Sequence, residues 1–111
     1  MQQTIMVSLA LPDAMRVCDD AIVCGSLTGE RIDQYVIDAP NGGRCAVAVY
    51  EKHFYRAGNR LTLTIVGDDF AGVTRIHCIG GGGGEGLFRF DWGASKSFEG
   101  TIERALEPYR V

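Results

Sequence analysis

Five consecutive glycines stand at Gly80–Gly84, directly before Glu85 and an aromatic segment that ends in Trp92. Glycine loses more backbone freedom on folding than any other residue, so such a run needs a reason. Glycine-rich turns that open onto a helix can direct several backbone N–H groups at an anion. The run has no G-x-x-x-x-G-K-[ST] spacing, however, and the carboxylate of Glu85 would repel phosphate. We therefore favour a mobile or tightly turned connection, and we keep an anion cradle as the alternative.

The only tryptophan, Trp92, follows Phe88 and Phe90, and strand alternation would expose Arg89 between the two phenylalanines. Aromatic clusters of this kind usually close the edge of a core, but they can also form a wall for a small ligand or a partner. The sequence therefore predicts one candidate binding site around the glycine run. Its residues are Gly81, Gly82, Gly83, Gly84, Glu85, Arg89 and Trp92.

The remaining residues with reactive side chains form no known catalytic or metal-binding pattern. The cysteines, which lack C-x-x-C spacing, predict reduced thiols as in cytoplasmic proteins. His77 and Cys78 are neighbours on an expected strand, so they point to opposite faces and cannot share a metal ion without a bulge. A Cys–His nucleophile pair would need His53 to meet His77 or Cys45 across strands, and the sequence does not give that register. Asp68-Asp69 is typical of a turn. We expect no catalytic residues, no metal and no cofactor.

Size and charge restrict the class of protein. The chain has 111 residues, 46% of them hydrophobic and 23% charged, with a formal net charge of −3. These values predict a single domain over residues 1–111 and argue against a general nucleic-acid binder. Residues 44–66 are locally basic and carry aromatic residues, which could stack single-stranded nucleic acid, but a solvated sheet face or guarded edge is the commoner origin. There is no apolar run of about 18 residues and no signal-peptide pattern, so we expect a cytoplasmic protein without a membrane partner.

Periodicity predicts an α+β fold. Apolar residues recur at helical spacing after Pro12, with Met15, Cys18 and Ile22 on one stripe that ends near Gly25. A second helical stripe follows Asp91 and continues to the C-terminus. Strands are expected over residues 4–10, 35–38, 44–56, 60–66 and 73–79, with a connector at 26–33.

The predicted order is therefore β-α-β-β-β-β-α. Tight turns make the middle strands an antiparallel meander, and both helices must bury their stripes on one face of it. The result is a two-layer sandwich. The helix-grip and TATA-binding-protein-like folds share this order of elements.

Three stretches resemble a family of small bacterial proteins of unknown function. They are Tyr50–Asn59, the glycine run, and Phe90-Asp91-Trp92-Gly93-Ala94 leading to Ser97-Phe98. The resemblance covers the C-terminal two-thirds of the chain. It implies a bacterial single-domain protein and no particular activity.

We therefore favour a non-enzymatic module that binds a small ligand or a protein through the Gly-rich loop and the aromatic segment. One alternative is a homo-oligomer with a structural role, joined through a sheet edge at residues 4–10 or 35–38. The other is an enzyme that depends on the Cys and His residues. If the glycines hold left-handed dihedrals or make room for a ligand, replacing Gly82 and Gly83 by alanine should lower stability or abolish binding.

Overall fold

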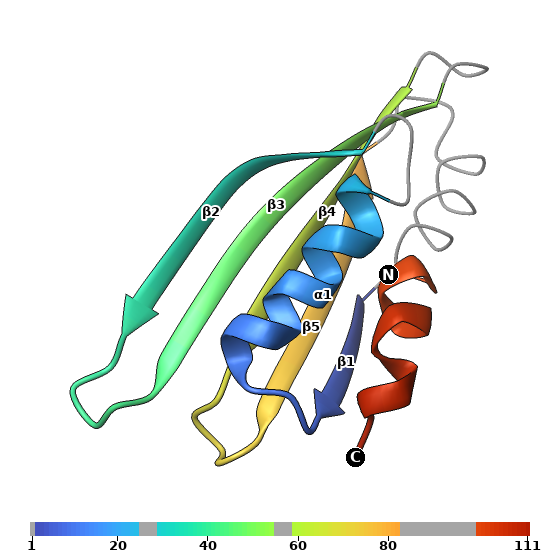
Figure 1. The fold of residues 1–111 in the computed structure, drawn as a ribbon. Coiled ribbons are helices and arrows are strands. Elements are labelled where there is room, and N and C mark those ends of the chain that lie inside the picture. The colour runs from blue at the N-terminus through green and yellow to red at the C-terminus, as the bar shows by residue number, and fades with distance from the viewer. Residues whose placement is uncertain (1, 25–28, 55–58, 83–99) are drawn as a thin grey trace.

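One five-stranded antiparallel sheet and two helices make up the computed structural model, which describes residues 2–24, 29–54, 59–82 and 100–111 (Figure 1). The sheet order is β1-β5-β4-β3-β2. The C-terminal helix is described over residues 100–106 and continues into a short 3-10 turn, η1 (Glu107–Tyr109). The other elements, in chain order, are β1 (Gln2–Val7), α1 (Leu11–Val23), β2 (Glu30–Asp38), β3 (Arg44–Phe54), β4 (Asn59–Asp68) and β5 (Thr74–Gly82). The predicted α+β class is confirmed.

Two tight turns at the same end of the sheet connect β2 to β3 and β4 to β5. Gly42 has φ +92° and Gly72 has φ +83°, values that glycine adopts without steric cost. The Asp69 carboxylate accepts a 2.7 Å hydrogen bond from the backbone N–H of Arg44, which ties the second turn to β3. The predicted turn role of Asp68-Asp69 agrees with this geometry, because the Asp68 carboxylate also accepts from the backbone N–H of Phe70.

Helix α1 follows β1, crosses one face of the sheet and leads to β2 at the opposite edge (Figure 1). Pro12 lies in its first turn, where the missing N–H has no cost. Its buried stripe includes Leu11, Met15, Cys18 and Ile22. Gly67 of β4 lets the helix approach closely, since a Cβ there would lie 2.8 Å from Leu11 Cδ1 and 2.9 Å from Met15 Sδ.

The core lies between the sheet and the two helices. In β1, β3, β4 and β5 the buried residues alternate along the strand and point to the helices, as strand geometry requires. The C-terminal helix adds Ile102 and Leu106, both fully buried. On the sheet side the buried residues include Ile5, Val7, Ala46, Ala48, Tyr50, Leu61, Leu63, Ile65, Ile76 and Cys78.

Two expectations about the strands are wrong. β2 begins at Glu30, so residues 30–34, which include part of the predicted connector, are strand. All nine residues of β2 are exposed, and an edge strand without a buried face has no apolar alternation to reveal it. β5 continues to Gly82, so the first three glycines, 80–82, pair with β4 and are not a loop. None of these three has a positive φ, which removes the left-handed explanation for them.

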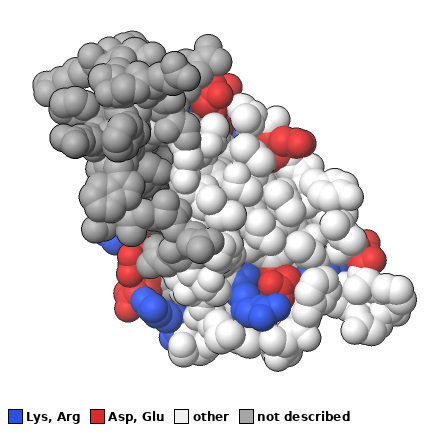
Figure 2. Space-filling model, turned by 180° about the vertical axis from the view of Figure 1, so that it is seen from behind, with Lys and Arg blue, Asp and Glu red and all other residues white. Residues whose placement is uncertain are grey.

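The sheet face away from α1 carries few charges (Figure 2). Val47 and Val66 lie opposite each other at its centre, and Tyr35 follows beside Val47 on β2. The ion pair between Arg75 and Asp68, 2.8 Å long, lies at one end of this face. The uncharged centre is unusual for a sheet face that no described helix covers.

Candidate functional site

A groove opens between α1 and the edge strand β2. The helix-facing residues of β3, such as Ala48 and Tyr50, are buried, whereas Gln34 and Val36 on the same face of β2 are exposed. α1 therefore covers β3 and leaves β2 open. The resulting groove has a volume of about 400 Å³. It is lined by Leu11, Pro12, Met15, Arg16, Asp19, Arg31, Gln34, Val36, Arg44, Ala46 and Tyr50.

Part of the groove lining is apolar. Leu11 and Met15 from the first turns of α1, Val36 from β2 and Ala46 from β3 all line it. Ala46 carries a single methyl group, so the space above β3 is not filled by its side chain. Apolar lining with a few polar groups at defined positions is the usual composition of a small-molecule pocket.

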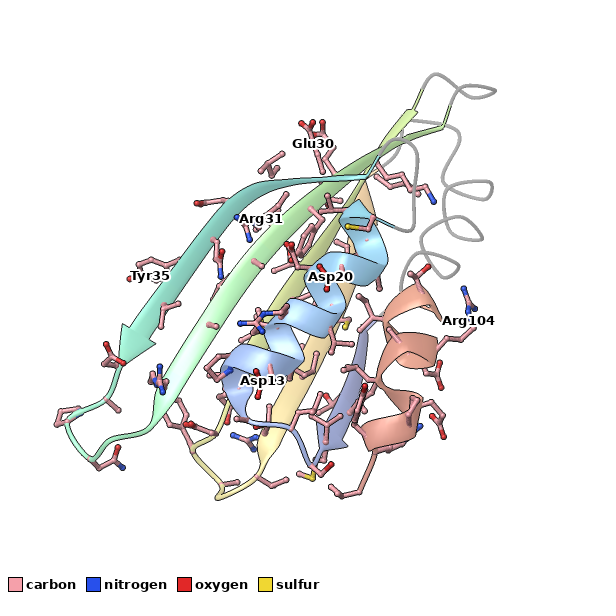
Figure 3. The ribbon with its side chains drawn as sticks, in the orientation of Figure 1. Asp13, Asp20, Glu30, Arg31, Tyr35 and Arg104 are labelled. Atoms are coloured by element: carbon pink, nitrogen blue, oxygen red, sulfur yellow. The ribbon has the colours of Figure 1, made fainter. Side chains whose placement is uncertain are left out.

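Asp19 holds the polar side of the groove in place. Its Oδ1 accepts a 2.8 Å hydrogen bond from the Tyr50 hydroxyl and a 3.2 Å bond from Arg31 Nη1. Burial, followed by the hydrogen bond to Asp19 and its negative charge, raises the pKa of Tyr50 far above the ordinary range. Tyr50 therefore remains a neutral donor, and Arg31 projects from β2 toward α1 while Tyr35 projects away from it (Figure 3).

Two more arginines lie at the groove. Arg16 of α1 makes no ion pair with any residue of the described segments, and Arg44 Nε lies 4.0 Å from Asp38 at the start of β3. The Arg44 side chain is 49% exposed, so its guanidinium remains accessible to a ligand. The groove therefore presents three guanidinium groups and one carboxylate, Asp19, in a chain whose formal net charge is −3.

The predicted glycine–aromatic site is not at this groove. Gly81 and Gly82 lie at the end of β5, opposite Thr62 and Leu61 of β4, and β4 separates them from β3. The other members of that predicted site, Gly83, Gly84, Glu85, Arg89 and Trp92, lie outside the described residues. The helix start predicted at Asp91 also lies outside them.

The residues considered for Cys–His chemistry do not converge. His53 stands opposite Arg60 on β4, whereas His77 stands opposite Val66, six residues further along that strand. His77 Nδ1 and Thr4 Oγ1 are 2.6 Å apart, and neighbouring Cys78 is buried in the core. All four cysteines are free. Within the described segments, no group of three His, Cys, Asp or Glu residues could hold a metal ion.

Cys18, on the buried stripe of α1, is also unsuited to nucleophilic chemistry. Burial, with a smaller effect from the charge of Asp19, raises the pKa of its thiol from 9.0 to about 12. The thiolate is the nucleophilic form of cysteine, so this side chain is inert at neutral pH.

Sequence reasoning missed the groove residues. Arg31 lies in a segment expected to be a connector, and Arg16 is not among the predicted site residues. One signal was available: among residues 44–52 of β3, whose burial the structure describes, Tyr50 is the only buried residue with a polar side chain, and a buried tyrosine hydroxyl usually has a partner. That partner had to come from α1, but the sequence does not say which residue.

The chain belongs to the Family of unknown function (DUF6054), whose model matches residues 2–110. The match covers nearly the whole chain, which is more than the C-terminal two-thirds expected from the resemblance. No curated protein and no solved structure matches the chain. No helix of the described segments is long and apolar enough to cross a membrane. The family has no assigned function, so a function has to be argued from the geometry of the groove.

Proposed function

We propose that this protein is a non-enzymatic binding module whose groove between α1 and β2 takes a small molecule with an anionic group and an apolar body. The observation that carries the proposal is the combination of three arginines, one carboxylate and several apolar side chains in the lining of one groove. The volume of about 400 Å³ falls in the ordinary range for small-molecule sites.

Guanidinium groups favour carboxylate, sulfonate and phosphate ligands because their planar N–H donors form two parallel hydrogen bonds to such groups. Arg31 is held by Asp19, so it is ordered before the ligand arrives. Arg16 and Arg44 would supply the remaining charge. The apolar part of the ligand would lie against Met15 and Val36, which face the interior of the groove.

A binding role fits the protonation of the groove better than catalysis does. Tyr50 stays a neutral donor because its pKa is raised, and Asp19 already accepts hydrogen bonds from Tyr50 and Arg31. No histidine, cysteine, serine or threonine is among the groove residues. The groove therefore offers charge and hydrogen bonds, without the nucleophile and base that covalent catalysis requires.

Other expectations are retained as proposals. The glycine–aromatic segment at residues 80–92 would be a second contact region for a ligand or partner. The fold would belong with the helix-grip and TATA-binding-protein-like folds, and the sheet order in which β1 pairs with β5 supports this. Residence in a bacterial cytoplasm is consistent with four free cysteines.

The groove can be tested with 8-anilinonaphthalene-1-sulfonate, a fluorescent dye with a sulfonate and an apolar body. We expect the protein to bind it at low salt and the double variant Arg16→Gln/Arg44→Gln to bind about tenfold or more weakly, since each hydrogen bond to a charged group is worth about 1.5–3 kcal/mol. Arg104→Gln is the matched control, because Arg104 lies on the C-terminal helix away from the groove (Figure 3).

A second dye separates charge recognition from groove shape. Uncharged N-phenyl-1-naphthylamine has the same aromatic body without the sulfonate, so its affinity should be the same for wild type and the double variant. Equal loss of both dyes would show that the substitutions changed the groove itself. Equal binding of the sulfonate dye by all three proteins would refute an anion site at the groove.

A further inference from the structure

The outer edge of β2 is the most exposed apolar feature of the described chain. Four of the ten exposed large hydrophobic residues lie on this one strand: Ile32, Tyr35, Val36 and Ile37. An edge strand presents unpaired backbone N–H and C=O groups, and apolar side chains along it make a pairing surface for another strand.

The opposite edge strand of the sheet, β1, is partly covered by other residues of the chain. The backbone N–H of Ser8 donates to Tyr109 O at 2.8 Å, and that of Val111 donates to Met6 O at 3.1 Å. The C-terminal residues therefore cover one end of β1, with an isolated bridge between Val7 and Arg110. Among the described segments, β3 is the only strand that pairs with β2.

We propose that two copies of this chain pair through β2, antiparallel, about a two-fold axis at Tyr35. Because β2 has a bulge between Arg31 and Asp33, Ile32 is skipped when residues are paired across the two strands. With that bulge, a register centred on Tyr35 places Asp38 opposite Arg31 of the second copy. It also places Ile37 opposite Asp33, and Tyr35 opposite itself.

Charge complementarity selects this register and a second copy as the partner. Centring the pairing on Gln34 would bring Glu30 opposite Ile37 and Arg31 opposite Val36. Centring it on Val36 would leave Arg31 without an opposing strand residue. Only the Tyr35 register puts an opposite-charge pair at both ends of the paired segment, and opposite charges directly across strands are favourable. The Asp38 side chain is 79% exposed, so it can reach such a partner.

The side of the sheet to which each paired residue points agrees with the same arrangement. Gln34 and Val36 point to the α1 side of the sheet. In the Tyr35 register, Gln34 of one copy lies opposite Val36 of the other. Both copies then have α1 on the same side of a continuous ten-stranded sheet. Because both residues also line the groove, the two grooves would meet at the two-fold axis. This last consequence rests on the proposed function, whereas the pairing itself does not.

Cross-linking tests the register directly. In chains where the accessible Cys24 and Cys45 are replaced by serine, Tyr35→Cys should form a covalent dimer with a short bifunctional maleimide. Ile37→Cys should not, because it lies opposite Asp33 of the second copy. A mixture of Gln34→Cys chains and Val36→Cys chains should cross-link to a heterodimer on the α1 side, which stacking through the other sheet face could not produce.

Sedimentation velocity without any ligand supplies the second measurement. Wild type should sediment at twice the monomer mass, and Asp38→Arg should weaken association about tenfold, since like charges then face each other. Asp20→Arg, on the exposed side of α1, is the matched control and should leave association unchanged (Figure 3).

A monomer at every concentration would overturn the proposal. So would a dimer in which Ile37→Cys cross-links as fully as Tyr35→Cys, or in which no β2 cysteine cross-links. Sulfonate-dye binding by a monomer would leave the groove site intact, so the two proposals fail separately.

Discussion

Replacing Tyr50 by phenylalanine removes one hydroxyl from the wall of the groove and leaves the ring in place. Tyr50 is only 1% exposed, and its hydroxyl donates a 2.8 Å hydrogen bond to Asp19. A hydrogen bond to a charged group contributes about 1.5–3 kcal/mol. The Asp19 side chain is 29% exposed and keeps Arg31 at 3.2 Å, so water and Arg31 can partly replace the lost donor. We therefore expect a loss of about 1.5 kcal/mol in the free energy of unfolding, at the lower end of that range.

Urea unfolding at neutral pH measures this loss. Tyr35→Phe is the matched control, because the Tyr35 side chain is on the exposed edge strand and its change should stay within about 0.5 kcal/mol. A double-mutant cycle of Tyr50→Phe with Asp19→Asn isolates the energy of the contact. If Tyr50→Phe costs no more than the control, or the cycle shows no coupling, the hydrogen bond does not hold the groove wall and the reasoning is refuted.

Three further predictions concern α1, β4 and β5. Gly67→Ala should lower stability by about 1–3 kcal/mol in urea unfolding, since the new Cβ would crowd Leu11 and Met15; an unchanged midpoint would contradict the close approach. Gly81→Ala should leave stability unchanged or raise it by up to about 1 kcal/mol, because its φ is not positive and, among the described residues, the new Cβ would meet only Thr62 Oγ1 at 3.4 Å. The free energy of unfolding of the wild type should fall as pH rises from 9.0 toward 12, because Cys18 loses its proton at a lower pH in the unfolded chain than in the folded protein. The total loss should be up to about 4 kcal/mol. Cys18→Ala should reduce this slope, and an equal slope in both proteins would refute the raised pKa.

The elements with a buried face were predictable from the sequence. The stripe of Met15, Cys18 and Ile22 gave α1, and the alternation in β3 correctly placed Ala46 and Ala48 on one face. Both signals exist because burial selects apolar residues at the period of the element. The sequence alone could not say which face of the sheet the helices cover, because the other face also carries valines.

Elements and sites whose residues are exposed leave no such signal in the sequence. β2 has nine exposed residues, so its first half was interpreted as a connector. The groove then went unpredicted, because it exists only where α1 fails to cover β2. Arg16, Arg31 and Arg44 come from three separate elements and meet through the sheet register. A composition-based search instead selected the glycine run, whose first three members turned out to be ordinary strand residues.

The exposure of β2 and the openness of the groove have one structural cause. α1 has one buried stripe, and the absence of a side chain at Gly67 lets its first turns pack closely on β4. A helix packed there contacts β2 through the ion pair between Asp19 and Arg31 and leaves Gln34 and Val36 exposed. A larger residue at position 67 would move α1 away from β4 and change the width of the groove. Gly67→Ala should therefore alter sulfonate-dye affinity as well as stability, whereas Gly81→Ala on β5 should alter neither the dye affinity nor the position of α1.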